Sequence, residues 1–172
     1  ASTYGYNDNG EYRLFVDGPY SYTNGPAINN WDGSFMGAMS IRRALALSRN
    51  IPALKAFQQV DDEKIIEFVS NLGIDPEEHS GSLYESVSLG AMEGGVNSLQ
   101  MAAAYAAFSN GGYYNEPYSV SKIVYRDTGE EETHQEVKRQ VMSDATAYMI
   151  TSILDDVTVT GGGAMENVAM KT

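Results

Sequence analysis

The sequence has 172 residues, of which 42% are hydrophobic and 20% are charged, which is enough to build the core of one domain or of a large piece of one. Its 23 acidic and 11 basic residues give a net charge of -12, which repels phosphate backbones and argues against a nucleic-acid partner. Cysteine is absent, and the two histidines, His79 and His134, stand far apart and are expected to be solvated surface residues. We therefore expect no disulfide, no metal and no cofactor.

Membrane and export segments are not found in the sequence. No run approaches the roughly 18 apolar residues of a membrane span. The stretch that begins Ala1-Ser2-Thr3-Tyr4 has neither the basic start nor the apolar run of a secretion signal. Any anchor or signal is therefore expected to lie outside this chain.

Residues 1–39 are rich in Gly, Asn, Tyr and Asp, and turn signals recur along them, as at Asp17-Gly18-Pro19 and Asp32-Gly33. This texture predicts a long irregular arm. Asp8-Asn9-Gly10 lacks the spaced carboxylates and closing glutamate of a calcium loop and is interpreted as a plain turn. From residue 40 onward the pattern becomes that of a folded unit, so we divide the chain into an arm, 1–39, and a partial domain, 40–172.

Three helices are predicted after the arm. Ser40 is placed to cap the first of them, about 40–48, and Pro52 fits the first turn of the second. Acidic residues at 61–63 begin the third, which Gly73 ends. The segment from Ser48 to Asn50 is therefore a turn between two helices.

The second half of the sequence mixes helices and strands. After a loop-like stretch at 75–95, Asn97 and Gln100 have capping-box spacing at the start of an alanine-rich helix that we expect to be buried. Alternation at 119–126 followed by a turn at 127–129 predicts a hairpin. A helix then starts at Ser143-Asp144, and residues 167–172 are interpreted as a strand.

The Ser-x-Asn at Ser48 and Asn50 has two open interpretations. Two fixed positions are a weak pattern, and both side chains could simply cap the adjoining helices, which would stabilise them by roughly 1 kcal/mol. At a helix junction, however, side chains can also point into a cleft. The middle residue, Arg49, is expected to be a surface charge.

The residues around this motif favour the second interpretation. Three blocks occur in order, and together they span about residues 29–172: 30–53 around Ser-x-Asn, the glycine-rich 88–112, and Lys171-Thr172 at the end. These blocks closely resemble the transpeptidase domain of class A penicillin-binding proteins, the bifunctional enzymes of bacterial cell-wall synthesis. The resemblance implies an extracytoplasmic enzyme, anchored in the membrane through a segment outside this chain and carrying a glycosyltransferase in the whole protein.

In that family a Ser-x-x-Lys, a Ser-x-Asn and a Lys-Thr-Gly line one cleft. By resemblance, Ser48 would relay a proton towards the leaving group, and Asn50 would bond the substrate amide and help orient the lysine of the nucleophile. Lys171 would keep the site positive, and Thr172 would bind the terminal carboxylate of the peptidoglycan stem peptide. β-Lactams would acylate the intact enzyme.

The sequence departs from the family pattern at the nucleophile. The Ser-x-x-Lys that it contains, Ser119 to Lys122, lies in a predicted strand, where positions three apart face opposite sides, and it follows the Ser-x-Asn instead of preceding it. The resemblance places the true nucleophile upstream of Ala1. We therefore expect this chain by itself to be inactive.

The sequence thus predicts an α+β fold: the mainly helical lobe of a penicillin-binding transpeptidase, with one β-hairpin, a C-terminal strand and most of the central sheet missing. We interpret the chain as part of a serine D,D-transpeptidase that cross-links stem peptides. A non-catalytic scaffold or peptide-binding module is the alternative, and a serine β-lactamase is disfavoured by the same blocks. The missing elements should leave apolar surface bare or covered by self-association.

Overall fold

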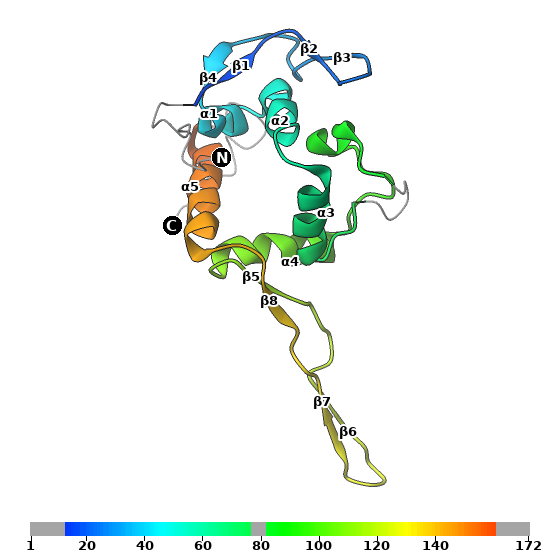
Figure 1. Cartoon of the computed structure of the whole chain (residues 1–172). Coiled ribbons are helices and arrows are strands. Elements are labelled where there is room, and N and C mark those ends of the chain that lie inside the picture. Colours follow the sequence, from blue (N-terminus) through cyan, green and yellow to red (C-terminus); the bar gives the residue numbers. More distant parts are fainter. Residues whose placement is uncertain (1–12, 77–81, 161–172) are drawn as a thin grey trace.

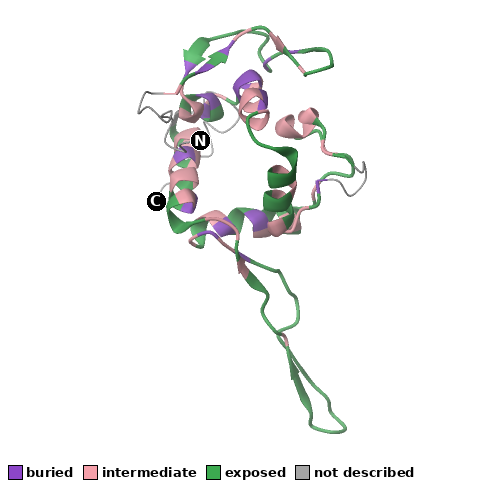
Figure 2. Cartoon of the chain, in the orientation of Figure 1, coloured by how far each residue is buried: buried purple, intermediate pink, exposed green. Residues whose placement is uncertain are grey.

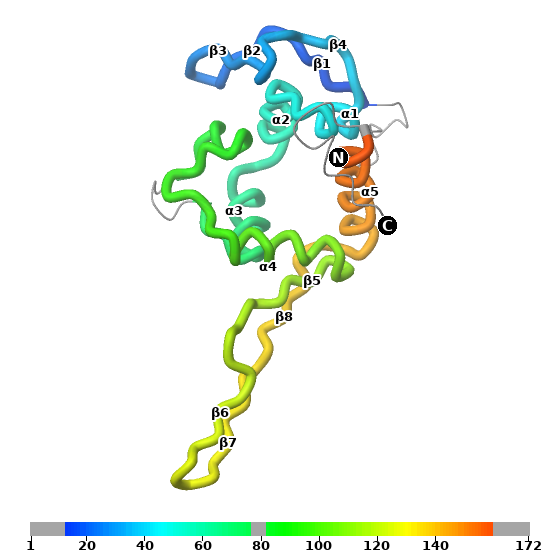
Figure 3. The backbone as a smooth tube through the Cα atoms, turned by 180° about the vertical axis from the view of Figure 1, so that it is seen from behind, coloured from blue at the N-terminus to red at the C-terminus, as the bar shows by residue number. Residues whose placement is uncertain are grey.

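Five α-helices dominate the structure, a computed structural model that describes residues 13–76 and 82–160. They are α1 (Ile41–Ala46), α2 (Asn50–Phe57), α3 (Asp62–Asn71), α4 (Ser98–Ser109) and α5 (Asp144–Thr160), with a 3₁₀ turn η1 (Glu85–Leu89). The ribbons of the five helices follow one another around an open ring, in which α5 returns to lie beside α1 (Figure 1). The same ring is visible from behind (Figure 3). None of the helices in the described ranges has the length and apolar character of a membrane span.

Short antiparallel strand pairs accompany the helices. Their strands are β1 (Phe15–Asp17) with β4 (Gly37–Met39), β2 (Tyr20–Ser21) with β3 (Ala27–Ile28), β5 (Tyr113–Asn115) with β8 (Lys138–Gln140), and β6 (Lys122–Val124) with β7 (Glu131–Thr133). The α+β class is therefore confirmed. The prediction of an irregular segment before residue 40 was wrong for its described part, because β1 to β4 pair there and lie over α1 and α2 (Figure 1).

Local capping signals explain where the helices begin and end. The Ser40 side chain accepts a hydrogen bond from the Arg43 amide, and Asn97 and Gln100 form the predicted capping box of α4. Gly73, with φ of 78°, follows α3, and a Cβ at that position would lie 2.2 Å from the Tyr114 hydroxyl. Only glycine satisfies both the backbone angle and this close approach.

Two small apolar clusters hold the ring together at different places. Ile28 from β3 packs with Ile51 and Leu54 of α2, and this cluster joins the N-terminal strands to the helices. The other cluster joins the end of α3 to α4 and β5, and its buried members are Leu72, Ala104, Ala107 and Tyr114.

The helix α4 is not buried as predicted. Only Ala104 and Ala107 are buried in it, whereas Leu99 is 62% exposed and Tyr105 is 54% exposed. No residue of α3 is buried, and much of this part of the ring is exposed (Figure 2). The alanine-rich composition signalled a packed helix, but within the described residues α4 packs mainly on α5, β5 and Leu72 and leaves Leu99, Met101 and Tyr105 exposed. The expected bare apolar surface is confirmed.

The predicted hairpin is confirmed and forms the tip of a long ribbon that projects away from α4 (Figure 1). Lys122 pairs with Thr133 in register. The strands β5 and β8, which the sequence did not predict, pair at the base of the ribbon and join it to the helices. At its side His134 is half-buried, stacked on Tyr118 with ring centroids 4.2 Å apart, so the expectation of a fully solvated histidine was wrong. The strand predicted at 167–172 and the second histidine, His79, lie outside the described residues.

Candidate functional site

The bend between α1 and α2 has a defined hydrogen-bond pattern. The Ser48 amide donates to the Leu45 carbonyl at 3.0 Å, and the Arg49 amide donates to the Ala44 carbonyl at 2.9 Å. These two bonds form the Schellman motif that closes many helices, with Leu47 as the C-cap of α1. In this motif the residue after the C-cap adopts the left-handed conformation, and here that residue is Ser48.

Ser48 is the one non-glycine residue in the described ranges with a positive φ, at 53°. Glycine normally fills this position, because a side chain there costs about 1–2 kcal/mol. The Ser48 side chain is exposed and its hydroxyl has no hydrogen-bond partner among the described residues. The serine therefore does not act as a side-chain cap, and such a strained, unpartnered residue is more often found at functional sites than elsewhere.

Asn50 does not cap a helix with its side chain either. Its Nδ2 donates to the Asn29 carbonyl at 2.8 Å, and the cap of α2 is supplied instead by Asn30, whose Oδ1 accepts from the Asn50 amide at 2.8 Å. Capping by Ser48 and Asn50, the structural alternative considered for the motif, is therefore wrong for both side chains. One side-chain atom of Asn50, Oδ1, has no partner in the described part of the chain.

Arg49 is buried, which contradicts its prediction as a surface charge. The residue is 3% exposed, and its Nε donates to Asp17 Oδ2 at 2.8 Å. One terminal nitrogen donates to Asp32 Oδ2 at 2.9 Å and the other to the Ser34 carbonyl at 2.6 Å. The guanidinium thus joins the helix bend to Asp17 at the end of β1 and to Asp32 and Ser34 in the loop between β3 and β4.

Hydrogen bonding fixes the charges in this cluster. Hydrogen bonds from the Ser34 side chain, then from its backbone and from Arg49, lower the pKa of Asp32 below its usual range. Burial by itself would lower the pKa of Arg49, but hydrogen bonds to Asp32 and Asp17 outweigh it and raise that pKa above its ordinary value. The ion pair of Asp32 with Arg49 is therefore charged at any pH near neutrality.

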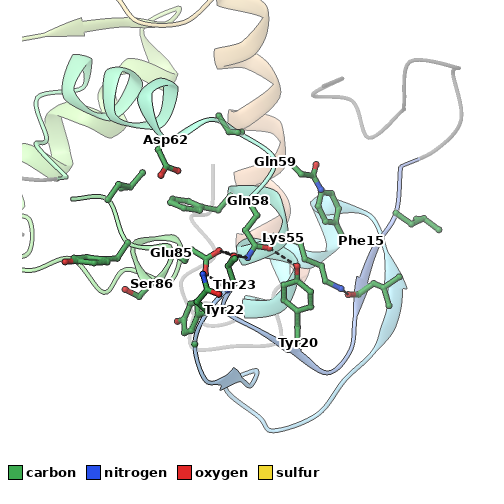
Figure 4. A pocket seen from close by; sticks show the side chains of 18 residues that line it. Phe15, Tyr20, Tyr22, Thr23, Lys55, Gln58, Gln59, Asp62, Glu85 and Ser86 are labelled. Carbon is green, nitrogen blue, oxygen red and sulfur yellow. Dashed lines mark hydrogen bonds between the residues drawn. The ribbon is translucent and has the colours of Figure 1, made fainter. Parts of the chain in front are cut away.

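A cavity in the described part of the structure is a separate feature. It has a volume of about 1200 Å³, and it lies between the N-terminal strands, the C-terminal half of α2 and the loop before η1 (Figure 4). Its polar groups mainly bond to one another: Gln58 Nε2 donates to Glu85 Oε1 at 2.6 Å, and Tyr20 donates to Gln58 at 2.8 Å. Neither Ser48 nor Asn50 lines it, so it is not the candidate active site.

The structure locates only part of the predicted site. Ser48 and Asn50 lie together at the bend, whereas Lys171 and Thr172 are outside the described residues, so their approach to the bend stays a prediction. The Ser-x-x-Lys from Ser119 to Lys122 lies in the exposed ribbon and not on a helical turn, and the Lys122 ammonium pairs with Glu131 at 2.6 Å. No metal site of three or more His, Asp or Glu side chains forms within residues 13–76 and 82–160.

Residues that support the site were missed in the sequence. Asp17 and Asp32 were interpreted as turn residues, and Asn30 was noted only as part of the family block. Each of the two carboxylates stands in a turn signal, where aspartate usually bonds its own backbone. Because the partner of both is Arg49, which lies 15 or more positions away, no local pattern could have identified the cluster.

Comparison with known families identifies the family of this chain. The family described as "Penicillin binding protein transpeptidase domain" matches residues 7–172, so the match extends further towards the N-terminus than the blocks noted in the sequence. The chain belongs to this family, and its relatives place it with the class A penicillin-binding proteins. It is 42% identical over 159 residues to Penicillin-binding protein 1A/1B of Bacillus subtilis, a match that covers 91% of this chain.

The chain spans 17% of the length of that relative. Among solved structures it is similar to penicillin-binding protein 1A from Haemophilus influenzae, with a TM-score of 0.75 and 23% identity over 92% of this chain and 29% of that one. It is also similar to penicillin-binding protein A of M. tuberculosis in an imipenem acyl-enzyme complex, with a TM-score of 0.70 and 17% identity over 84% of this chain and 38% of that one. These two likenesses show the fold.

Proposed function

We propose that this chain is the middle part of a serine D,D-transpeptidase that cross-links peptidoglycan stem peptides and is acylated by β-lactams when complete. In the whole protein the nucleophilic Ser-x-x-Lys would precede Ala1. A membrane anchor and a glycosyltransferase would also lie outside the chain, and the domain would act on the extracytoplasmic face of a bacterial membrane. This assignment is supported by the family and by the solved relative that carries imipenem as an acyl-enzyme.

One observation carries the proposal: the serine of the Ser-x-Asn occupies a strained backbone position with its hydroxyl exposed and unpartnered among the described residues. Glycine would close α1 at less cost, and no group within residues 13–76 and 82–160 uses the hydroxyl. A requirement for the hydroxyl in a reaction accounts for serine at this position. A scaffold would have no use for it.

The residues have distinct proposed roles. Ser48 relays a proton between the nucleophile and the leaving group, because an unassisted serine hydroxyl is a weak nucleophile. Asn50, whose Nδ2 donates to the Asn29 carbonyl, accepts a hydrogen bond from the substrate amide or from the lysine of the nucleophile through Oδ1, which has no partner in the described part of the chain. Lys171 holds positive charge near the developing oxyanion, and Thr172 binds the terminal carboxylate.

The test is labelling with a fluorescent penicillin. The chain as given should not be labelled, whereas a complete domain, extended through the upstream serine and past Thr172, should be labelled covalently. Removing the hydroxyl with Ser48→Ala should lower the acylation rate of the complete domain by about 100-fold or more, the usual scale for loss of a proton-transfer group. The matched control is Ser119→Ala, on the ribbon, which should leave the rate unchanged.

Two results would contradict the proposal. Labelling of the short chain would show that the nucleophile lies within it, and loss of that labelling in Ser119→Ala would identify the residue. A folded complete domain that no penicillin labels would favour the alternative, a non-catalytic scaffold or peptide-binding module.

A further inference from the structure

We propose that Arg49, the middle residue of the Ser-x-Asn, is a positioning residue that holds Ser48 and Asn50 in their reactive arrangement. The inference rests on the proposed function and goes beyond it, because it assigns a role to a buried side chain. It also makes β1 and the loop between β3 and β4 part of the active site, through Asp17, Asp32 and Ser34.

The contacts of Arg49 select a guanidinium. The side chain is 1% exposed, and its three nitrogens donate to Asp17, Asp32 and the Ser34 carbonyl, all at 2.9 Å or less. Each acceptor bonds to a different nitrogen of the planar guanidinium group. A lysine ammonium on a flexible stem cannot reach all of them at once. The cluster is therefore specific for arginine and not merely for a positive charge.

Arg49 directly follows Ser48 and helps to fix its backbone conformation. Its amide donates to Ala44 and closes the turn in which Ser48 has a φ of 53°. A residue with a Cβ atom, such as Ser48, disfavours that angle. The turn therefore persists only while Arg49, the next residue, is held in place. The buried guanidinium holds it, because moving Arg49 would break all of its side-chain hydrogen bonds at once.

The same cluster reaches Asn50 by a second path. Asp17 uses Oδ2 to bind Arg49 and Oδ1 to accept from Asn30 Nδ2 at 2.7 Å. Asn30 in turn caps the Asn50 amide through its own Oδ1. The Asp17 carboxylate therefore connects the backbone positions of Ser48 and Asn50. A change at Arg49 is expected to displace these two residues together.

Arg42 provides a matched control on the preceding helix. It donates to Asp156 at 2.9 Å and to the Ser152 carbonyl at 2.7 Å, so it also ties distant segments together, α1 to α5. Its side chain is 37% exposed, and its hydrogen bonds to described residues reach only Ser152 and Asp156, away from the bend. Loss of Arg42 tests what loss of an interhelical ion pair does without disturbing Ser48.

The experiment compares Arg49→Lys with Arg42→Lys in the complete domain, using stopped-flow acylation by a fluorescent penicillin. The limiting acylation rate is separated from the apparent binding constant, and the labelled fraction reports how much protein is folded. Arg49→Lys should lower the limiting rate by about tenfold or more with the labelled fraction retained, because small misplacements of reacting groups cost this much. Arg42→Lys should change the rate by less than about twofold, the scale of an exposed ion pair.

A second variant, Arg49→Ala, leaves space between the two carboxylates, and added guanidinium at millimolar concentration should restore part of its rate but should do nothing for Arg42→Ala. If Arg49→Ala does not fold, the lysine variant decides. A wild-type rate in folded Arg49→Lys, or an equal loss in Arg42→Lys, would overturn the positioning role while leaving the proposed function intact. Failure of the wild-type complete domain to label would overturn both.

Discussion

The helix bend and the helix α4 show opposite relations between burial and polarity. At the bend the buried side chains are charged, with Asp17 and Arg49 both exposed by 3% or less. On α4 the exposed side chains are apolar, and Met101, Tyr105 and Phe108 follow one another at helical spacing along one face, with Met101 and Tyr105 exposed by 41% and 54%. Each arrangement is unfavourable unless a suitable partner is present.

The difference shows which part of the molecule is complete within this chain. Every charge buried at the bend has its partner inside residues 17–49, so this region needs nothing from outside. The apolar face of α4 has no such partner in the described ranges. The buried charges of the bend are therefore compensated within the described residues, whereas the apolar face of α4 is left exposed there.

The largest expected effect is the loss of the buried ion pair. Arg49→Leu in the complete domain should lower the free energy of unfolding by about 3–5 kcal/mol, because Asp17 is then left buried with an unpaired charge. Arg42→Leu, at the half-exposed pair with Asp156, should lower it by no more than about 1 kcal/mol. Urea unfolding measures both.

A double variant sharpens this prediction. Adding Asp17→Asn to Arg49→Leu removes the uncompensated carboxylate, so it should recover part of the lost free energy of unfolding. Equal losses for the two arginines, or no recovery in the double variant, would contradict the prediction. The buried charges at the bend would then contribute no more to the free energy of unfolding than the half-exposed pair of Arg42 and Asp156.

The exposed face of α4 predicts a second, smaller effect. The chain as given should bind a hydrophobic dye or self-associate, and Met101→Ser with Tyr105→Ser should reduce both, because the two residues form one apolar stripe. The control, Val124→Ser with Tyr125→Ser, removes exposed apolar side chains from the ribbon, away from that stripe. Light scattering and dye fluorescence are the measurements. A monomer that binds no dye would contradict the prediction that α4 presents an exposed apolar face.

What the sequence predicted correctly depends on contacts between near neighbours. The Ser40 cap, the capping box from Asn97 to Gln100 and the stop at Gly73 are each defined within a few residues, and all three are confirmed. The hairpin tip between β6 and β7 belongs to the same class. Such features depend on contacts within a few residues of the chain and do not need distant segments.

What the sequence did not predict depends on contacts between distant segments. Arg49 looks like a surface charge because no acidic residue lies near it in the sequence, and its partners become adjacent only when β1 pairs with β4. The prediction that α4 is buried failed for the opposite reason. Its composition indicates a buried helix, but the neighbours that would cover it are not among the described residues. Composition reports the environment for which a segment is suited, and tertiary contacts decide whether that environment is present.

The smallest expected effect is an acid dependence of stability at Asp32. Its pKa is lowered in the folded state from an ordinary 3.8, first by the Ser34 hydroxyl, then by the Ser34 amide and Arg49. A group with a lowered folded pKa contributes stability that is fully present above 3.8 and is lost as the pH falls below it towards the folded value. Wild-type and Asp32→Asn forms of the complete domain should therefore differ in urea midpoint at neutral pH, and the difference should begin to narrow only as the pH falls below 3.8.

The control for this effect is Asp61→Asn, since the pKa of Asp61 is also lowered, mainly by its hydrogen bond from Lys64. That pair is about 70% exposed on both sides, so its contribution should be smaller and should disappear in high salt, whereas the Asp32 difference should persist because Arg49 is shielded from solvent. A difference for Asp32→Asn that stays constant with pH, or that salt abolishes, would show that the charge of Asp32 does not stabilise the cluster. The bend would then depend on Asp17 alone for its anchoring carboxylate.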